Sequence, residues 1–301
     1  MASTVLISHN DLDGIACIVL AIYFRLPIDE MYITSYNSDN SEIYNKFQRI
    51  IITDFSITEN EFKALRKKGK QIVIIDHHKS SEWISKYSNC ISDLKRCGSR
   101  IFYESFIRRS SSACTQFIKL VDIYDRWITS DPLWEQALDL NFLYEQRCRP
   151  FNRTTLIFKN HSYEKTFYRS FISSTLSKFH STFSFTETDI KYITQAKEHL
   201  ESEYQKAKST LSFHTDTRNI KYAIIHHTDF TSLICHRVLQ ENPDITYVLA
   251  LSTVTINARS RDNFDVTQLN GINGHKNAGG GRYSASYIKQ LLLNQAVMTY
   301  K

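Results

Sequence analysis

The chain of 301 residues has few of the residues that interrupt regular structure, with eight glycines and four prolines. This composition argues against long disordered tracts, and the sequence holds no repeat and no low-complexity segment. Long apolar runs are also missing, because the longest, from Gly14 to Phe24, is far too short to span a bilayer. The first residues lack the basic-then-apolar pattern of a secretory signal. We therefore expect a chain with no membrane partner, long enough to form two domains.

Cysteine pairs at metal-binding or redox spacing are absent as well. The six cysteines, at positions 17, 90, 97, 114, 148 and 235, include no C-x-x-C pair. This pattern favours reduced thiols over disulfides or zinc ligands, and it predicts a cytoplasmic protein.

The excess of positive charge is mild. The formal net charge of +6 is compatible with an anionic ligand, but a mild excess of this kind is more often just a solvated basic surface. Basic and aromatic residues alternate irregularly between 147 and about 185, for example at Arg149, Phe151, Arg153 and Tyr163. Two interpretations remain open for this stretch: a surface on which nucleic-acid bases stack, or an amphipathic linker helix with inward-facing aromatics.

Short apolar runs alternate with helical segments over the first 130 or so residues. The pattern predicts strands at 5–8, 31–35, 50–53 and 72–75, and helices at 13–24, 58–68, 100–109 and 113–123. Thr58 is a candidate N-cap for the second of these helices. This order indicates an α/β fold with a mainly parallel, doubly wound sheet covered on both faces. Ligands of such sheets gather outside the carboxyl ends of the strands.

The remaining sequence predicts a second, smaller α/β domain. Its strands are expected at 221–225, 246–251 and 254–258, with a helix at 232–240, a glycine-rich turn at 271–281 and a final helix from about 286. A clear helix at 186–211 precedes it. We therefore expect a catalytic domain at 1–146, a helical connector at 147–217 and a substrate-binding domain at 218–301.

Acidic and imidazole side chains follow three of the predicted strands. A lone D-H-H triplet is about as often a polar turn as a site, but three such strand ends in one chain are hard to ascribe to chance. Carboxylates and imidazoles suit divalent ions such as Mn²⁺ or Mg²⁺. Two ions roughly 3.5–4 Å apart can generate a hydroxide and stabilise a phosphoryl displacement. The residues concerned are His9, Asp11, Asp13, Asp54, Asp76, His77 and His78.

A further ligand is expected from the segment 121–127. Asp122 and Asp125 are both candidates, because residues three apart lie on one face of a helix. One of them could bind a metal while the other stays at the surface or orients a ligand histidine.

Anion-binding residues are expected in the C-terminal part. The guanidinium of Arg259 offers a bidentate grip on a phosphate. The glycine-rich turn could present backbone N–H groups to an anion, with His275 as a further donor. For His226 and His227 we favour a structural role, since neighbours on a strand point to opposite faces.

The ordered set of motifs resembles the DHH-family phosphoesterases, of the subgroup with a DHH-associated C-terminal subdomain. Taken together, the matching segments cover roughly 5–127 and 220–285 in the family's order. They are His9 to Gly14, Asp54, Asp76-His77-His78, Tyr124 to Trp127, Ala258 to Ser260, Phe264 to Val266, and Gly274 to Gly280.

The resemblance implies a centre of two Mn²⁺ ions, with Mg²⁺ as the other option. His9 and Asp11 would bind one ion, and Asp54 would bridge to the other. The second ion would be bound by Asp13, His77 and Asp125. Among the catalytic residues Asp54, Asp76 and His78, Asp76 would orient His77, and His78 would lie near the scissile phosphate.

The resemblance also implies that a terminal phosphate of the substrate is held across an interdomain cleft. The residues carried over for this role are Arg259, Ser260, Gly274, His275, Asn277, Gly279 and Gly280. The sequence departs from the family pattern twice. Only Asn10 separates His9 from Asp11, where some relatives have three residues, and the glycines that usually precede His275 are replaced by Gly271-Ile272-Asn273-Gly274.

The implied function is a Mn²⁺-dependent phosphoesterase that cleaves phosphodiester or phosphomonoester bonds with a metal-activated water. Short RNA or DNA oligonucleotides, linear dinucleotides and 3′-phosphoadenosine 5′-phosphate are the candidate substrates. The alternatives are a catalytically inactive nucleotide-binding protein, a cyclic-dinucleotide phosphodiesterase and a longer single-strand exonuclease. A homodimer is compatible with the sequence, which does not specify the oligomeric state.

Overall fold

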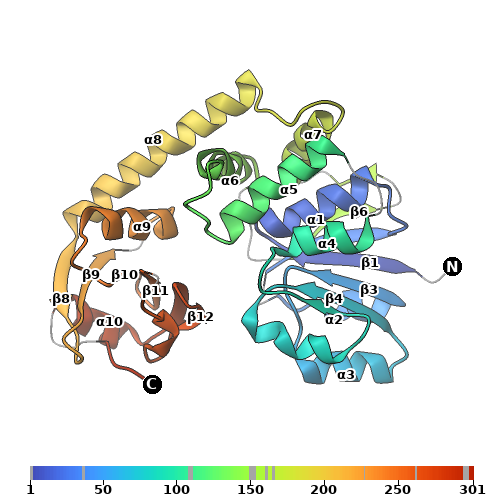
Figure 1. Cartoon of the computed structure of the whole chain (residues 1–301). Coiled ribbons are helices and arrows are strands. Elements are labelled where there is room, and N and C mark those ends of the chain that lie inside the picture. Colours follow the sequence, from blue (N-terminus) through green and yellow to red (C-terminus); the bar gives the residue numbers. More distant parts are fainter. Residues whose placement is uncertain are drawn as a thin grey trace. The chain divides into compact units, whose positions relative to one another are not determined.

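The computed structural model describes residues 3–35, 38–107, 111–148, 154–159, 162–164, 167–226, 228–261, 263–293 and 298–301. The chain divides into two compact units, Met1–Thr194 and Gln195–Lys301 (Figure 1). The boundary falls within a long helix, whereas the sequence analysis placed boundaries at 146/147 and 217/218. No helix within the described ranges is long and apolar enough to cross a membrane.

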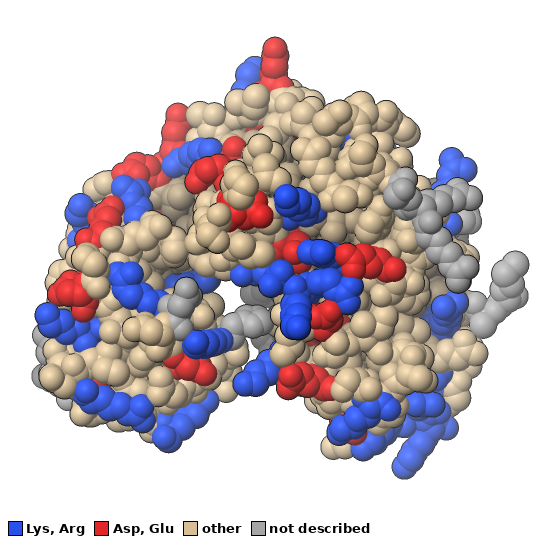
Figure 2. Space-filling model, in the orientation of Figure 1, with Lys and Arg blue, Asp and Glu red and all other residues tan. Residues whose placement is uncertain are grey.

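Charged side chains of both signs are interspersed over the face of the molecule shown in Figure 2. Among the described residues, some basic groups pair with acidic neighbours, as Arg96 does with Asp93 and Arg237 with Glu201.

The first unit is built on a seven-stranded sheet in the order β5-β4-β3-β1-β2-β6-β7. Strands β1 to β5 pair in parallel, whereas β6 pairs antiparallel with both of its neighbours, β2 and β7. The mainly parallel sheet predicted from the sequence is thereby confirmed. The strands are β1 (Thr4–His9), β2 (Glu30–Thr34), β3 (Arg49–Thr53), β4 (Gln71–Asp76), β5 (Ile91–Ser92), β6 (Thr155–Lys159) and β7 (Ser162–Tyr163).

Helices cover both faces of this sheet, which makes it doubly wound as expected (Figure 1). Helices α2 and α3 lie on one face, and α1 and α4 lie on the other. Thr58 caps α3 as predicted, since its hydroxyl accepts the N–H of Glu61 at 3.2 Å. The helices of this unit are α1 (Leu12–Tyr23), α2 (Ser41–Lys46), α3 (Glu59–Lys67), the 3₁₀ helix η1 (Lys79–Lys86), α4 (Gly98–Phe106), α5 (Ser112–Asp125), α6 (Trp134–Cys148) and α7 (Tyr168–Lys178).

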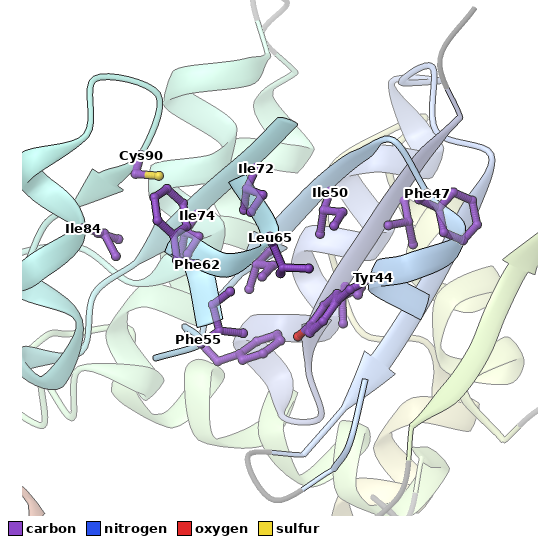
Figure 3. Packing of buried hydrophobic residues seen from close by; sticks show 14 residues of the cluster. Tyr44, Phe47, Ile50, Phe55, Phe62, Leu65, Ile72, Ile74, Ile84 and Cys90 are labelled. Atoms are coloured by element: carbon purple, nitrogen blue, oxygen red, sulfur yellow. The ribbon is translucent and has the colours of Figure 1, made fainter. Parts of the chain in front are cut away.

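The sequences of the strands are continuous apolar runs, because both faces of the sheet are buried. On the face covered by α2 and α3, Ile50, Ile72 and Ile74 pack against Tyr44 and Phe62 (Figure 3). Side chains at alternate strand positions point to the opposite face, toward α1. Helix α1 is buried over most of its surface, which explains why its sequence is apolar almost all round.

The strand order reverses at β1. The chain passes from β1 to its neighbour β2, then crosses to β3 on the other side of β1 and continues outward to β4 and β5. The carboxyl ends of β1 and β3 therefore flank a topological switch point, the place where open α/β sheets bind ligands. Segments after both strands carry the candidate metal ligands.

The expected helical connector at 147–217 is only partly helical. Residues 155–159 form β6, which pairs antiparallel with β2 and covers an edge of the first sheet. Lys159 of β6 lies 3.2 Å from the buried Glu30 of β2, which helps to fix this pairing. Such long-range pairing is not visible in a local sequence pattern, so the strand was missed.

The aromatic residues of this segment largely pack inward. Phe158, Tyr168, Phe171 and Phe179 are buried, whereas Phe167 is exposed. This favours the packing interpretation over a base-stacking surface for the described part of the segment. Arg149, Phe151 and Arg153 lie outside the described residues.

The long helix α8 (Glu187–Ser209) starts at the predicted position. The Thr186 hydroxyl accepts the N–H of Asp189 at 3.2 Å, and the Asp189 carboxylate accepts the N–H of Thr186 at 2.9 Å. This is a capping box. Asp189 is fully buried and also binds Arg147 at 2.9 Å and Lys178 at 2.8 Å, so the start of α8 is fixed to α6 and α7.

The second unit contains a six-stranded sheet in the order β12-β13-β11-β10-β9-β8. Only β9 and β10 are parallel. The expectation of a smaller α/β domain is confirmed. Its further elements are β8 (Ser212–Thr215), β9 (Lys221–His226), α9 (Thr231–Glu241), β10 (Tyr247–Leu251), β11 (Thr255–Ser260), the 3₁₀ helix η2 (Val266–Gln268), β12 (Asn273–His275), β13 (Ala278–Arg282) and α10 (Ala285–Leu292).

The expected glycine-rich turn is a β-hairpin, formed by β12 and β13. Strand β13 pairs on both sides, with β11 and with β12, so the ladders use its backbone N–H groups and leave few for an anion. The glycines permit close approach, since a Cβ on Gly279 would lie 2.6 Å from the carbonyl oxygen of Asn273. Gly279 and Gly280 therefore lie in a paired strand and not in a turn, and an anion-binding role for them stays a prediction.

We expect Ile74→Ala to lower the free energy of unfolding by about 2–5 kcal/mol, because Ile74 is fully buried in the core of the first sheet. Val73 is a matched control, as it is the neighbouring residue on β4, faces the other side of the sheet and is only half-buried. Urea denaturation of the two alanine variants measures the difference. Equal losses would contradict the packing described for the two faces.

Candidate metal centre

The candidate ligands lie at the carboxyl ends of three neighbouring parallel strands. His9 is the last residue of β1, Asp54 directly follows β3, and Asp76 is the last residue of β4. Because β4, β3 and β1 are adjacent in the sheet, segments far apart in sequence meet at one edge. Three local strand ends thus combine into one cluster.

The segment between β1 and α1 folds tightly back on itself. The Asp11 carboxylate caps α1 by accepting the N–H of Gly14 at 2.8 Å. A Cβ on Gly14 would lie 2.0 Å from the carbonyl oxygen of His9, so only glycine permits this approach. The Tyr144 hydroxyl donates to the carbonyl of Asn10 at 2.8 Å. Tyr144 supports the loop from 134 positions away, and the sequence analysis missed it.

A first group of ligand atoms comes from His9, Asp11 and Asp54, and its members lie within 4.8 Å of one another. The Nδ1 atom of His9 is 2.7 Å from Oδ2 of Asp11 and 3.8 Å from Oδ2 of Asp54. One imidazole nitrogen and two carboxylates could hold a divalent ion.

A second group comes from Asp13, His77 and Asp125, again within 4.8 Å of one another. The Nε2 atom of His77 is 3.9 Å from Oδ2 of Asp13 and 3.5 Å from Oδ2 of Asp125. Asp125 comes from the end of α5, so this group joins segments following β1 and β4 to a helix.

Asp54 directs one carboxylate oxygen toward each group. Its Oδ1 is 3.2 Å from Nε2 of His77, and its Oδ2 is 3.8 Å from Nδ1 of His9. The backbone at Asp54 has a φ of 61°, a left-handed conformation that aspartate tolerates better than most residues. A hydrogen bond of 2.9 Å from its N–H to the carbonyl of Ile75 fixes this turn.

Asp76 and His78 lie beside the two groups. Oδ1 of Asp76 is 2.7 Å from Nδ1 of His78 and accepts the backbone N–H of His77 at 2.8 Å. Asp76 was expected to orient His77, and it contacts the backbone N–H of that residue. It also contacts the ring of His78. Burial tends to raise the pKa of Asp76, but the hydrogen bond to His78 and the nearby imidazoles outweigh it and lower the pKa.

The structure separates the two aspartates of the α5 segment. Oδ1 of Asp122 accepts the N–H of Cys97 at 2.8 Å, and its Oδ2 accepts from Arg100 at 2.9 Å. Asp125 instead faces His77. The candidate ligand is therefore Asp125, whereas Asp122 belongs to a neighbouring hydrogen-bond network.

The chemistry of the cluster fits a bound cation. Within the described residues, the Oδ2 atoms of Asp54, Asp76 and Asp125 are buried and accept no hydrogen bond. Burial, together with the nearby carboxylates, raises the pKa of Asp54 and of Asp125 well above the usual range. A divalent ion would offset this repulsion. The donors are nitrogen and oxygen atoms without thiolates, which suits Mn²⁺ or Mg²⁺.

In the second unit, Arg259 lies on β11 opposite Ala278 of β13, and Ala278 lies opposite His275 of β12. The side chain of His275 is outside the described part of the structure. Asn257, two residues before Arg259, is on the same face of β11 and opposite Gly280. Asn257 was missed as a candidate, although the two-residue period of a strand could have identified it.

Two other expected substrate contacts have structural roles. The buried hydroxyl of Ser260 donates to the carbonyl of Phe264 at 2.7 Å, on the face of β11 opposite to Arg259. The Asn277 amide donates to the carbonyl of Arg261 at 2.6 Å. Both side chains therefore bind main-chain carbonyls, those of Phe264 and Arg261. Gly274 and Gly279 belong to the hairpin strands.

The comparisons with known proteins agree with this geometry. The sequence profile of the DHH family, N-terminal domain, matches residues 3–141. The oligoribonuclease NrnB of Bacillus subtilis (strain 168) is 23% identical over 308 residues, which cover 93% of this chain and 71% of NrnB.

Two solved structures share the fold. The DHH domain of a protein described as a member of a ribosomal protein family has a TM-score of 0.70 at 13% identity, over 98% of this chain and 85% of that one. The manganese-bound exonuclease RecJ has a TM-score of 0.56 at 10% identity, over 98% of this chain and 89% of that one. Residues 3–141 are therefore similar to the DHH family, N-terminal domain, and the solved structures show the same fold.

Proposed function

We propose that this protein is a divalent-metal-dependent phosphoesterase that hydrolyses short oligoribonucleotides. The match of residues 3–141 to the DHH family, N-terminal domain, supports the reaction class. The observation that carries the proposal is the pair of ligand groups, in which Asp54 belongs to the first and lies 3.2 Å from His77 of the second. The likeness to an oligoribonuclease over 93% of the chain supports the substrate class.

We assign one ion to His9 and Asp11 and the other to Asp13, His77 and Asp125, with Asp54 between them. Two bound divalent ions would supply a water of lowered pKa and would offset the charge on the phosphate oxygens. We propose Mn²⁺ because the ligands are carboxylates and imidazoles and because the related RecJ structure is bound to manganese. Mg²⁺ is the alternative that the same oxygen-rich ligands allow.

The chain's own residues orient the reacting groups. Asp76 holds Nδ1 of His78 at 2.7 Å, which fixes the ring and leaves Nε2 as its other polar atom. We assign to His78 a contact with the scissile phosphate, where a protonated Nε2 would donate to an oxygen of the phosphate or of the leaving group.

In the second unit we assign Arg259 to a phosphate of the substrate. A guanidinium forms two parallel hydrogen bonds with a phosphate, and the small side chain of Ala278 on the neighbouring strand leaves room for one. Asn257 on the same face offers one donor and one acceptor group to a neighbouring polar part of the substrate. We leave Ser260 and Asn277 out of this assignment, because their side chains donate to the carbonyls of Phe264 and Arg261.

The alternatives differ in observable ways. A catalytically inactive nucleotide-binding protein would be indicated by the loss of an acidic ligand, and Asp11, Asp13, Asp54 and Asp125 all lie in the two groups. A cyclic-dinucleotide phosphodiesterase or a longer single-strand exonuclease would use the same metal chemistry on a different substrate. Substrate preference therefore separates these possibilities.

The decisive experiment is Mn²⁺-dependent release of mononucleotide from a labelled RNA dinucleotide. Reactions with 3′-phosphoadenosine 5′-phosphate, a cyclic dinucleotide and a longer single strand run in parallel. We expect the dinucleotide to be cleaved fastest, with cleavage abolished by a chelator. If the long strand or the cyclic dinucleotide is cleaved faster, the proposed substrate is wrong and that molecule takes its place. If none of the four substrates is cleaved, the enzymatic proposal is overturned.

We expect Asp54→Asn to reduce turnover by at least about 10²-fold, because the loss of one preorganised electrostatic contact in an active site lowers the rate by about that factor. The amide keeps the shape of the side chain and tolerates the positive φ at this position, so the circular dichroism spectrum should be unchanged. Asp244→Asn is the matched control, because Asp244 is exposed and pairs only at the surface with Lys221. A variant at Asp54 with wild-type turnover would remove the bridging role.

Arg259→Ala should raise KM for the dinucleotide about tenfold to a hundredfold, since charge-assisted hydrogen bonds contribute about 1.5–3 kcal/mol. Binding of Mn²⁺, followed by calorimetry, should not change. Arg237→Ala removes the same charge from a half-buried position on α9, where Arg237 pairs with Glu201, and serves as the control. An unchanged KM in the Arg259 variant would exclude this residue from the substrate site.

A further inference from the structure

The N-terminus of α4 holds the carboxylate of Asp13. Oδ2 of Asp13 accepts the N–H of Gly98 at 2.6 Å, and Oδ1 accepts the N–H of Ser99 at 2.9 Å. These two donors are the first backbone N–H groups of α4, which have no partner inside the helix. Asp13 therefore caps a helix that starts 85 residues further along the chain.

This cap differs from an ordinary one because Asp13 is also a candidate ligand of the second group. Both of its oxygens are fixed by rigid main-chain donors, and its side chain is fully buried. Each carboxylate oxygen can still accept a second interaction, since it has a further lone pair. The same Oδ2 that binds Gly98 lies 3.9 Å from Nε2 of His77. The orientation of Asp13 is thus set by α4.

Gly98 makes the short contact with Asp13 sterically possible. A Cβ at this position would lie 3.0 Å from Oδ2 of Asp13, and 3.0 Å and 3.1 Å from Cβ and Cα of Asp54. The backbone of Gly98 has no positive φ, so close approach and not backbone conformation requires glycine here. A methyl group at residue 98 would therefore be too close to two candidate ligands, Asp13 and Asp54.

Asp122 fixes the same end of α4 from the other side. Its Oδ1 accepts the N–H of Cys97, the residue before Gly98, at 2.8 Å. Its Oδ2 accepts from Arg100 of α4 at 2.9 Å. The side chain of Cys97 caps no helix N–H, so Asp122 and Asp13 together bind the start of α4. Three consecutive N–H groups of residues 97–99 are divided between these two aspartates.

We propose that Gly98 and Asp122 are positioning residues for the metal ligand Asp13, acting through the N-terminus of α4. This inference rests on the proposed function, because it assumes that Asp13 binds an ion. Asp122, which does not join the ligand groups, determines where the helix starts. Gly98 then determines how closely the helix approaches Asp13 and Asp54.

The test is Mn²⁺ binding to the full chain, measured by electron paramagnetic resonance titration, with the unfolding temperature of the metal-free protein measured in parallel. We expect Gly98→Ala and Asp122→Ala each to weaken one of the two Mn²⁺ sites by about tenfold to a hundredfold, the usual effect of losing a partner of a metal ligand. Asp122→Asn should restore most of the affinity, because its amide oxygen can still accept the N–H of Cys97.

Glu104→Gln is the matched control. Glu104 is also on α4 and also binds Arg100, at 2.9 Å, but it lies outside the hydrogen bonds that join Asp13 and Asp122 to residues 97–99. Its variant should bind both ions as the wild type does. If Gly98→Ala does not fold, the two variants of Asp122 decide the question.

The outcomes separate the inference from the function on which it rests. Wild-type affinity in both Gly98→Ala and Asp122→Ala, with or without a lower unfolding temperature, would overturn the positioning role and leave the metal site intact. A wild-type protein that binds no Mn²⁺ would overturn the proposed metal centre and this inference with it.

Discussion

The repulsion among buried carboxylates is the constraint on which the rest of the first unit depends. Asp13 and Asp54 are buried, and Asp11 and Asp125 lie against them. Charges gathered in this way are unfavourable unless hydrogen-bond donors, imidazoles or a cation surround them. Two neighbouring imidazoles and several backbone N–H groups supply part of this compensation, and the ligand geometry leaves a place for cations to supply the rest.

The sheet topology explains why this cluster can exist at all. Parallel strands β1, β3 and β4 end at the same edge, and the chain leaves each strand in a different direction. Below the cluster, the Thr53 hydroxyl donates to the Ser8 hydroxyl at 2.7 Å, and both residues are fully buried. This bond joins the ends of β3 and β1 directly beneath the ligands. The apolar core on both faces then keeps the strand ends in register.

In the second unit, the expected glycine-rich turn is a hairpin of two strands. Glycines 279–281 lie in a central strand, where they allow β12 and β13 to approach closely. The side chains of Asn257 and Arg259 share one face of the neighbouring strand β11. A run of glycines is locally compatible with a turn and with a crowded strand, and only the pairing of neighbouring strands distinguishes the two.

The sequence by itself determined the parallel α/β architecture, the strand ends that carry His9, Asp54 and Asp76, and a set of nitrogen and oxygen donors without thiolates. These features follow from local periodicity and from side-chain chemistry, and both can be recognised within short segments of the sequence. Tertiary structure alone decided that Asp125 and not Asp122 faces His77, that Asp76 contacts the ring of His78, and that α4 holds Asp13. Each of these depends on contacts between segments distant in sequence or on the direction of one side chain, and local patterns carry no information about either.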